Sequence, residues 1–114
     1  MKSIASEADL NVSNGVFVLK FWATWCGPCR MLNPVMEKLE KEFDKVTFYS
    51  VDVDQAPDLA QKFKVKSLPT VVFLQDGEEK ERALGLQMIK PLRTILRGLS
   101  PESEEMIEEK EKTG

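Results

Sequence analysis

The sequence predicts an α/β domain in which a central mixed β-sheet of four to five strands is flanked by helices on both faces. Two observations carry this prediction. Nearly continuous apolar runs occupy residues 16–22, 46–51 and 70–74, which is typical of strands buried on both faces. Helical patterns lie between and after these runs. The 114 residues, 42% of them hydrophobic, suffice for one compact core and leave no room for a second domain.

Only a short segment precedes the first of these strands. Ser3 or Ser6 could cap a truncated helix that runs through Ala8 and Leu10. The sequence therefore leaves open whether the sheet has four strands or a very short fifth. Residues 1–9 contain no continuous apolar segment of the signal-peptide kind, and no stretch approaches membrane-spanning length, so we expect a cytoplasmic protein without a membrane partner.

Residues 16–22 form the first long strand, in which Lys20 is the polar exception. Apolar residues then recur at helical spacing over residues 31–43, and charged residues occupy the other side. This pattern predicts an amphipathic helix of about 14 residues. Pro34 lies inside it and is expected to kink it.

The second long strand, residues 46–51, leads to a short helical pattern. Asp54 or Gln55 can open this helix, which continues through Pro57 to Phe63. A proline is tolerated in the first turn of a helix, where its missing N–H costs nothing. The sequence thus predicts one short helix between the second and third long strands.

The third long strand, residues 70–74, is followed by the turn signal Asp76-Gly77. This turn predicts a hairpin with an antiparallel edge strand near residues 80–84. The last helix of the core is predicted over residues 89–99. We therefore assign residues 1–99 to the domain and residues 100–114 to an acidic tail.

The tail begins with Ser100-Pro101, which resembles a helix N-cap followed by a proline. A further helix over residues 102–112 is therefore possible. Its apolar content is little more than Met106 and Ile107, which favours a solvated tail over a docking element.

Charge and composition argue against nucleic acid binding. The net charge is −3 and both signs are interspersed, whereas nucleic acid binding requires a basic patch. We therefore expect no nucleic acid partner.

The chain has two cysteines, Cys26 and Cys29, placed directly between the first long strand and the following helical pattern. A two-residue spacer lets the sulfurs form a small disulfide ring, and the free amides of a helix start stabilise a negatively charged sulfur. The thiolate is the attacking species in thiol–disulfide exchange. We predict that Cys26 attacks and that Cys29, one turn later and more buried, resolves the mixed disulfide. Pro28 suits the first turn and stiffens the spacer.

Two other roles for this cysteine pair are weaker. Structural zinc needs about four ligands, and the chain has no histidine and no third cysteine, so we expect no metal. A purely structural disulfide would close a very short loop and would constrain the unfolded chain little.

The sequence resembles the thioredoxin family. The resemblance is carried by residues 21–30 (FWATWCGPCR), by Ser67-Leu68-Pro69-Thr70 before the third long strand, by Asp76-Gly77 and by Gly85. These features occur in the family's order and spacing over residues 15–99. A lone C-x-x-C would be weak evidence, whereas this combination is highly specific.

The resemblance implies a docking site for extended protein segments. Pro69 is implied to be a cis proline beside the disulfide, so that a substrate strand pairs with the main chain of Leu68. From the residues alone, Pro69 could equally be a trans proline at the start of a strand, and Gly85 could be a simple turn glycine. The implied apolar groove around Cys26 is lined by Trp25, Gly27, Pro28, Leu68 and Gly85.

The implied reaction is dithiol–disulfide exchange on protein substrates, with a thioredoxin reductase as electron donor and no bound cofactor. We expect a monomer, because the implied apolar groove is small. Two alternatives remain open, a specialised thiol–disulfide oxidase or isomerase and a docking or assembly factor in which the cysteines are dispensable.

The sequence departs from the family pattern at two positions. Where thioredoxins usually have a buried aspartate, six residues before the first cysteine, this chain has Lys20, and Ser50 takes the place of the usual lysine on the adjacent strand. A charged Lys20 would favour thiolate, a neutral one could accept a proton, and a long stem could instead carry the charge to water. We predict that Lys20 stabilises the thiolate and makes the protein less reducing than its Gly-Pro spacer suggests.

Overall fold

A computed structural model describes residues 1–100 and shows a five-stranded mixed sheet with the strand order β1-β3-β2-β4-β5. The strands are β1 (Lys2–Ile4), β2 (Val16–Trp22), β3 (Thr47–Asp52), β4 (Thr70–Gln75) and β5 (Glu78–Leu84). Strands β1, β3 and β2 are parallel, while β4 runs antiparallel to β2 and β5 antiparallel to β4. The predicted fold class is confirmed, and the open question of the sheet edge is answered by a very short fifth strand.

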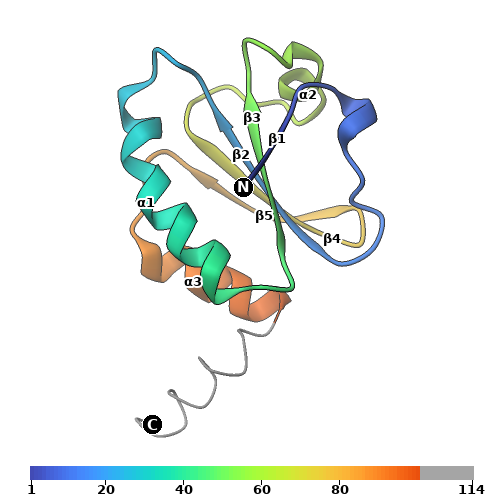
Figure 1. Ribbon diagram of the computed structural model, residues 1–114, viewed down its shortest axis with the longest axis vertical. Coiled ribbons are helices and arrows are strands. Elements are labelled where there is room, and N and C mark those ends of the chain that lie inside the picture. Colours follow the sequence, from blue (N-terminus) through green and yellow to red (C-terminus); the bar gives the residue numbers. More distant parts are fainter. Residues whose placement is uncertain (101–114) are drawn as a thin grey trace, which may run out of the picture.

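Helices cover both faces of this sheet. Helices α1 (Gly27–Glu42) and α3 (Ile89–Leu99) lie side by side on one face, and α2 (Pro57–Lys62) lies on the other (Figure 1). The apolar stripe of α1 and α3 packs on β2, β3 and β4. That layer contains Leu32, Met36, Leu39, Phe43, Leu92 and Leu96. The opposite layer is built on Phe17, Leu19 and Phe21 of β2 together with Leu59 of α2.

The alternation of side chains along β2 decides where Lys20 lies. Val16 and Val18 pack in the layer covered by α1 and α3, and Lys20 is the next residue in the same row. Six of the seven residues of this strand are buried, and Trp22 is half-buried. A strand buried on both faces therefore carries a lysine toward helix α1.

Several predicted boundaries differ from the structure. The apolar pattern covers residues 31–43, whereas α1 also includes the predicted first turn at the cysteine pair, begins at Gly27 and runs through Pro34. The edge strand begins at Glu78 rather than near residue 80. It was missed there because its exposed charged residues carry no apolar pattern. The last helix spans Ile89–Leu99, as predicted.

Helix α2 does not start at the residues that the sequence predicts. Helix α2 begins at Pro57 after Ala56, with no side-chain cap, so the predicted opening by Asp54 or Gln55 is wrong. Here the backbone makes the turn, with the N–H of Gln55 donating to the carbonyl of Asp52 at 3.0 Å.

The N-terminal segment holds a single 3-10 turn, η1 (Glu7–Asp9), in place of the expected truncated helix. Ser6 is its N-cap residue but makes no capping hydrogen bond. The predicted tail helix over residues 102–112 lies outside the described residues.

The β4–β5 hairpin closes as its turn signal predicts. Asp76 and Gly77 both adopt positive φ, 51° and 85°, as a tight hairpin turn requires. The N–H of Gly15 donates to the Asp76 carboxylate at 2.8 Å, which ties the start of β2 to this turn.

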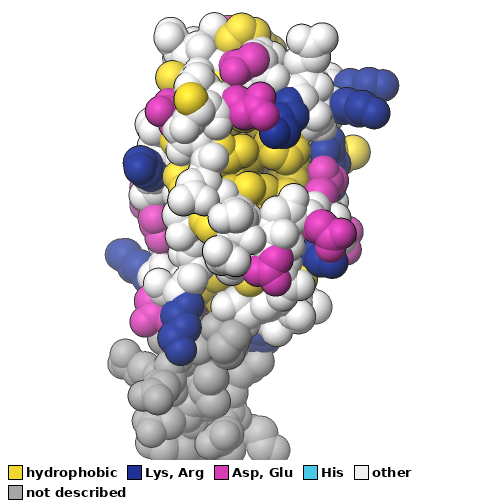
Figure 2. Space-filling model, turned by 90° about the vertical axis from the view of Figure 1, so that its right-hand side faces the viewer, with side chains coloured by type: hydrophobic (Ala, Val, Ile, Leu, Met, Phe, Trp, Pro, Cys, Tyr) yellow, Lys and Arg dark blue, Asp and Glu magenta, His cyan; other side chains and the backbone are white. Residues whose placement is uncertain are grey.

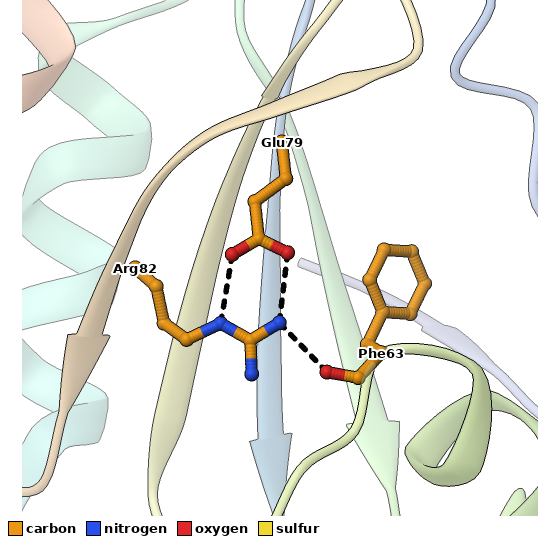
Figure 3. A network of polar contacts seen from close by, with 3 residues as sticks. All are labelled: Phe63, Glu79 and Arg82. Atoms are coloured by element: carbon orange, nitrogen blue, oxygen red, sulfur yellow. Dashed lines mark hydrogen bonds and ion pairs between the residues drawn. The ribbon is translucent and has the colours of Figure 1, made fainter.

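Strand β5 is fastened to the end of α2 by one arginine. Two nitrogens of Arg82 donate to the two carboxylate oxygens of Glu79 at 2.8 and 2.7 Å, and one of them also donates to the Phe63 carbonyl at 2.7 Å (Figure 3). The hydrogen bond from Arg82 lowers the pKa of the Glu79 carboxyl group. On the side of the molecule that lies to the right in Figure 1, hydrophobic side chains gather near the middle and charged side chains of both signs surround them (Figure 2).

Candidate active site

The two cysteines lie at the start of α1, just after the end of β2. Cys26 is the N-cap residue of α1, Gly27 is its first helical residue and Pro28 lies in the first turn. A disulfide joins Cys26 and Cys29, whose Cα atoms are 5.4 Å apart. Cys26 therefore lies at the positive end of the dipole of a 16-residue helix, although its side chain makes no capping hydrogen bond in the disulfide state.

Cys26 lies in the wall of an open groove of about 650 Å³. The groove runs from the start of α1 to the segment that follows α2, and it is mostly apolar. It is lined by Trp25, Cys26, Gly27, Pro28, Val53, Ala60, Val65, Lys66, Ser67 and Leu68. Four of the predicted docking residues are therefore brought together beside the sulfur: Trp25, Gly27, Pro28 and Leu68.

Trp25 presents its ring to solvent. The side chain is 70% exposed, and its indole N–H donates to the Asp54 carboxylate at 2.9 Å. An exposed aromatic ring held in place by a hydrogen bond provides a rigid apolar contact surface. Sequence reasoning did not identify Asp54 as a site residue.

Pro69 and Gly85 do not line this groove, but they lie together beside it. The Leu68–Pro69 peptide bond is cis. The N–H of Gly85 donates to the carbonyl of Pro69 at 2.8 Å, and Gly85 has a φ of 79°, which favours glycine. The Thr70 hydroxyl donates to the Ser67 carbonyl at 2.6 Å and holds the turn before Pro69.

The other side of the disulfide is a different environment. Cys29 is 1% exposed, compared with 6% for Cys26. It lines a second cavity, of about 380 Å³, between α1 and the ends of β2 and β3. This cavity does not include Cys26, and the groove does not include Cys29. Each cysteine of the pair therefore borders a separate space.

Lys20 belongs to the cavity of Cys29. Its side chain is 4% exposed, so its charge is not carried to water. Its Nζ donates to Oδ1 of Asn33 on α1 and lies 5.9 Å from the centroid of the Trp22 ring. Burial lowers the pKa of Lys20, and the nearby carboxylate of Glu37 acts in the opposite direction.

The register between β2 and β3 brings together Lys20 and Ser50, the two residues that depart from the family pattern. Lys20 of β2 lies opposite Ser50 of β3, and both line the cavity. Asn33 completes the set from α1, four residues after Cys29 and therefore on the same face of the helix. Asn33 was missed, although its spacing from Cys29 is visible in the sequence.

Among residues 1–100 no group of three or more metal-ligating side chains is gathered. No helix in the same range has the length and apolar character needed to cross a bilayer.

Comparison with known proteins gives one consistent result. The family model described as Thioredoxin matches residues 3–97. The thioredoxin of Staphylococcus haemolyticus is 41% identical over 97 residues, which cover 84% of this chain and 93% of that protein. The thioredoxin of Chlamydia trachomatis is 43% identical over 89 residues, 76% of this chain and 87% of that protein.

Solved structures agree with the sequence relatives. Fasciola hepatica thioredoxin superposes with a TM-score of 0.81 at 38% identity, covering 88% of this chain and 100% of the other. Oxidized mitochondrial thioredoxin 3 from Saccharomyces cerevisiae also has a TM-score of 0.81, at 30% identity, covering 87% of this chain and 95% of the other.

Proposed function

Because this chain belongs to the thioredoxin family and is a thiol–disulfide oxidoreductase, we propose that it is a general reductant of protein disulfides recycled by a thioredoxin reductase. The thiol–disulfide reductase activity follows from its relatives together with the Cys26–Cys29 pair. The electron donor, the breadth of substrates and the roles of individual residues are the proposal.

The observation that carries the proposal is the asymmetry of the disulfide. Cys26 borders an open apolar groove, whereas Cys29 is buried behind it. An incoming disulfide therefore has access to one sulfur only. The N-terminus of α1 supports negative charge on that sulfur, which makes Cys26 the attacking group.

The reaction proceeds in two exchanges. The Cys26 thiolate attacks one sulfur of the substrate disulfide, a mixed disulfide forms, and the other substrate sulfur leaves as a thiolate. Cys29 then attacks the sulfur of Cys26, the mixed disulfide breaks, and the second substrate sulfur is released. Two electrons pass from the protein to the substrate.

Substrate binding is assigned to the groove and to the turn beside it. Trp25, Gly27, Pro28 and Leu68 supply apolar contact. Pro69, with no N–H of its own, leaves the adjacent main chain of Leu68 open for pairing with an extended segment, and Gly85 supports Pro69 from β5. Main-chain pairing reads little sequence, which supports broad specificity.

We also propose that the protein is a monomer that acts in the cytoplasm. Both described cysteines are used by the redox pair. In a reducing compartment, paired cysteines are more often catalytic than structural.

The decisive test is an insulin disulfide reduction assay with NADPH, with and without a thioredoxin reductase. We expect turnover that depends on the reductase and that disappears in Cys26→Ala/Cys29→Ala. If the protein reduces insulin with dithiothreitol but with none of the thioredoxin reductases tried, its disulfide reductase activity stands and the proposed recycling partner is refuted. Full biological activity of the double variant would instead favour the docking-factor alternative.

A further inference from the structure

The cavity beside Cys29 brings several polar side chains into an otherwise apolar layer. It lies at the end of the row that Val16 and Val18 begin, where helix α1 starts. Seven residues line it: Lys20, Trp22, Ala23, Cys29, Arg30, Asn33 and Ser50. One of the two redox cysteines therefore forms part of its wall.

The cavity wall is rich in hydrogen-bond donors. The indole N–H of Trp22 is buried and has no hydrogen-bond partner among residues 1–100. Ser50 supplies a hydroxyl, and Lys20 has three N–H donors, of which Asn33 accepts one. No carboxylate is among the lining residues. Buried donors without acceptors cost free energy, and a negative charge in the cavity would relieve that cost.

Lys20 of β2 is held against the face of helix α1 that carries Cys29. Its partner Asn33 is one helical turn beyond that cysteine, on the same face of the helix. The amide of Asn33 is neutral, so it fixes the ammonium group without cancelling its charge. Within residues 1–100, no carboxylate lies within ion-pair distance of Lys20.

The other charged groups near Lys20 come from two elements. Glu37 of α1 and the amino group of Met1 border an adjoining cavity with Lys20, and the Met1 amino group is paired with Glu40 at 2.9 Å. Arg30 of α1 adds a second positive charge to the wall and donates to the Thr24 carbonyl at 3.1 Å. The neighbouring strands place only Ser50 and Val71 opposite Lys20. The two charged residues that line the cavity of Cys29, Lys20 and Arg30, are both positive.

We propose that this cavity holds the sulfur of Cys29 as a thiolate in the reduced protein, with Lys20, positioned by Asn33, as its counter-charge. The inference rests on the proposed disulfide reductase function and names the groups that prepare its second step. The thiol proton of Cys29 passes to solvent, and the thiolate then attacks the sulfur of Cys26. The Cys26–substrate bond breaks, the Cys26–Cys29 bond forms, and the leaving substrate thiolate takes the electron pair and a proton from water.

Two consequences follow from this arrangement. Resolution of the mixed disulfide needs no buried carboxylate to accept the proton, because the charge of Lys20 has already favoured its loss. Stabilising a thiolate also stabilises the reduced state over the disulfide, so Lys20 makes the protein less reducing. The sulfur on which Lys20 acts is Cys29, rather than Cys26.

The test is a pH titration of both cysteines by NMR, using the Cβ chemical shifts of the reduced full-length protein. In Lys20→Met we expect the midpoint of Cys29 to rise by about one pH unit or more, while that of Cys26 moves little. Lys20→Arg should restore most of the shift because it retains the charge. Lys80→Met removes one exposed lysine, paired with Glu78 on β5, and serves as the control for net charge.

A second variant keeps the inference testable if Lys20→Met fails to fold. Asn33→Asp preserves side-chain size but places a carboxylate against Lys20, so the midpoint of Cys29 should rise again. An unchanged Cys29 midpoint in folded Lys20→Met or Asn33→Asp, or a rise confined to Cys26, would overturn the proposal. The titration needs no substrate, and therefore failure of insulin reduction by the wild-type protein refutes the proposed function separately.

Discussion

A buried charge lies near each end of helix α1, Glu42 on the helix itself and Lys20 on strand β2, and the two have opposite kinds of partner. At the C-terminal end, Glu42 is 5% exposed and accepts two hydrogen bonds from Arg93 of α3, at 2.8 and 2.6 Å. At the N-terminal end, Lys20 is 4% exposed and is bound by the neutral amide of Asn33.

The difference separates a structural charge from a functional one. A bidentate ion pair neutralises the far end and links α1 to α3, so that charge has no effect beyond its partner. Among residues 1–100, the charge near the disulfide has no carboxylate within ion-pair distance, although a buried cation without such a partner opposes folding. On our proposal, its compensation comes from Cys29, and only when the disulfide is reduced.

The largest effect on activity is expected from removing one cysteine of the redox pair. Cys29→Ser should lower the turnover of insulin reduction by at least about 1000-fold, because the mixed disulfide can no longer be resolved. Mass spectrometry should show a covalent substrate adduct on Cys26. The matched variant Cys26→Ser should lose as much turnover without forming the adduct. An adduct on Cys29 in that variant would reverse the assigned roles.

Breaking the ion pair at the far end should cost stability rather than activity. Arg93→Met leaves Glu42 buried without its bidentate partner, which typically costs about 3 kcal/mol of unfolding free energy. Denaturant unfolding measures this loss. The double variant Glu42→Gln/Arg93→Met should recover most of it, and a double variant as unstable as the single one would contradict the role given to the charge.

Removing the charge at the redox end should have the opposite sign. In the oxidised protein, Lys20→Met should raise the unfolding free energy by about 1 kcal/mol at pH 7, because an uncompensated buried cation is replaced by an apolar side chain. Burial lowers the folded pKa of Lys20 below 10.5, so the penalty is present below the folded pKa and is relieved as pH rises toward 10.5. The gain should therefore shrink in alkaline solution. A gain that does not change with pH would point to packing instead of charge.

The smallest effect is expected from the exposed counterpart of the Arg93 pair. Arg82 binds Glu79 with the same bidentate geometry on edge strand β5, where water competes (Figure 3). Arg82→Ala should cost no more than about 1 kcal/mol. Arg82 holds the pKa of Glu79 below its ordinary value, so the contribution is present at neutral pH and is lost as pH falls through that lowered value. A loss as large as that of Arg93→Met would show that burial does not explain the difference.

Most of the fold could be predicted because its signals are local. The continuous apolar character of β2 and the periodic apolar residues of α3 each identify one type of element, and Asp76-Gly77 identifies the hairpin. Prediction was weakest where those signals are missing. Strand β5 begins among exposed charges, and α2 has no side-chain cap, so contacts with the rest of the sheet decide where both begin.

The candidate site divides in the same way. Spacing in the sequence placed Cys26 at a helix start and Cys29 one turn later, and the motif around Pro69 indicated a docking site. Sequence reasoning also identified Lys20 as unusual but could not say which sulfur it faces. That depends on the register of β2 with β3 and on the packing of α1 across them.

The sequence by itself determined the redox pair, the strand that leads to it and the presence of a lysine in a buried row, because hydrophobic periodicity and short-range spacing are properties of the chain. Only the tertiary structure decided that the two cysteines border different spaces and that Asn33 holds Lys20 on the side of Cys29. The physical reason is that burial, dielectric environment and hydrogen-bond partners arise between elements far apart in the sequence, and no local pattern encodes them.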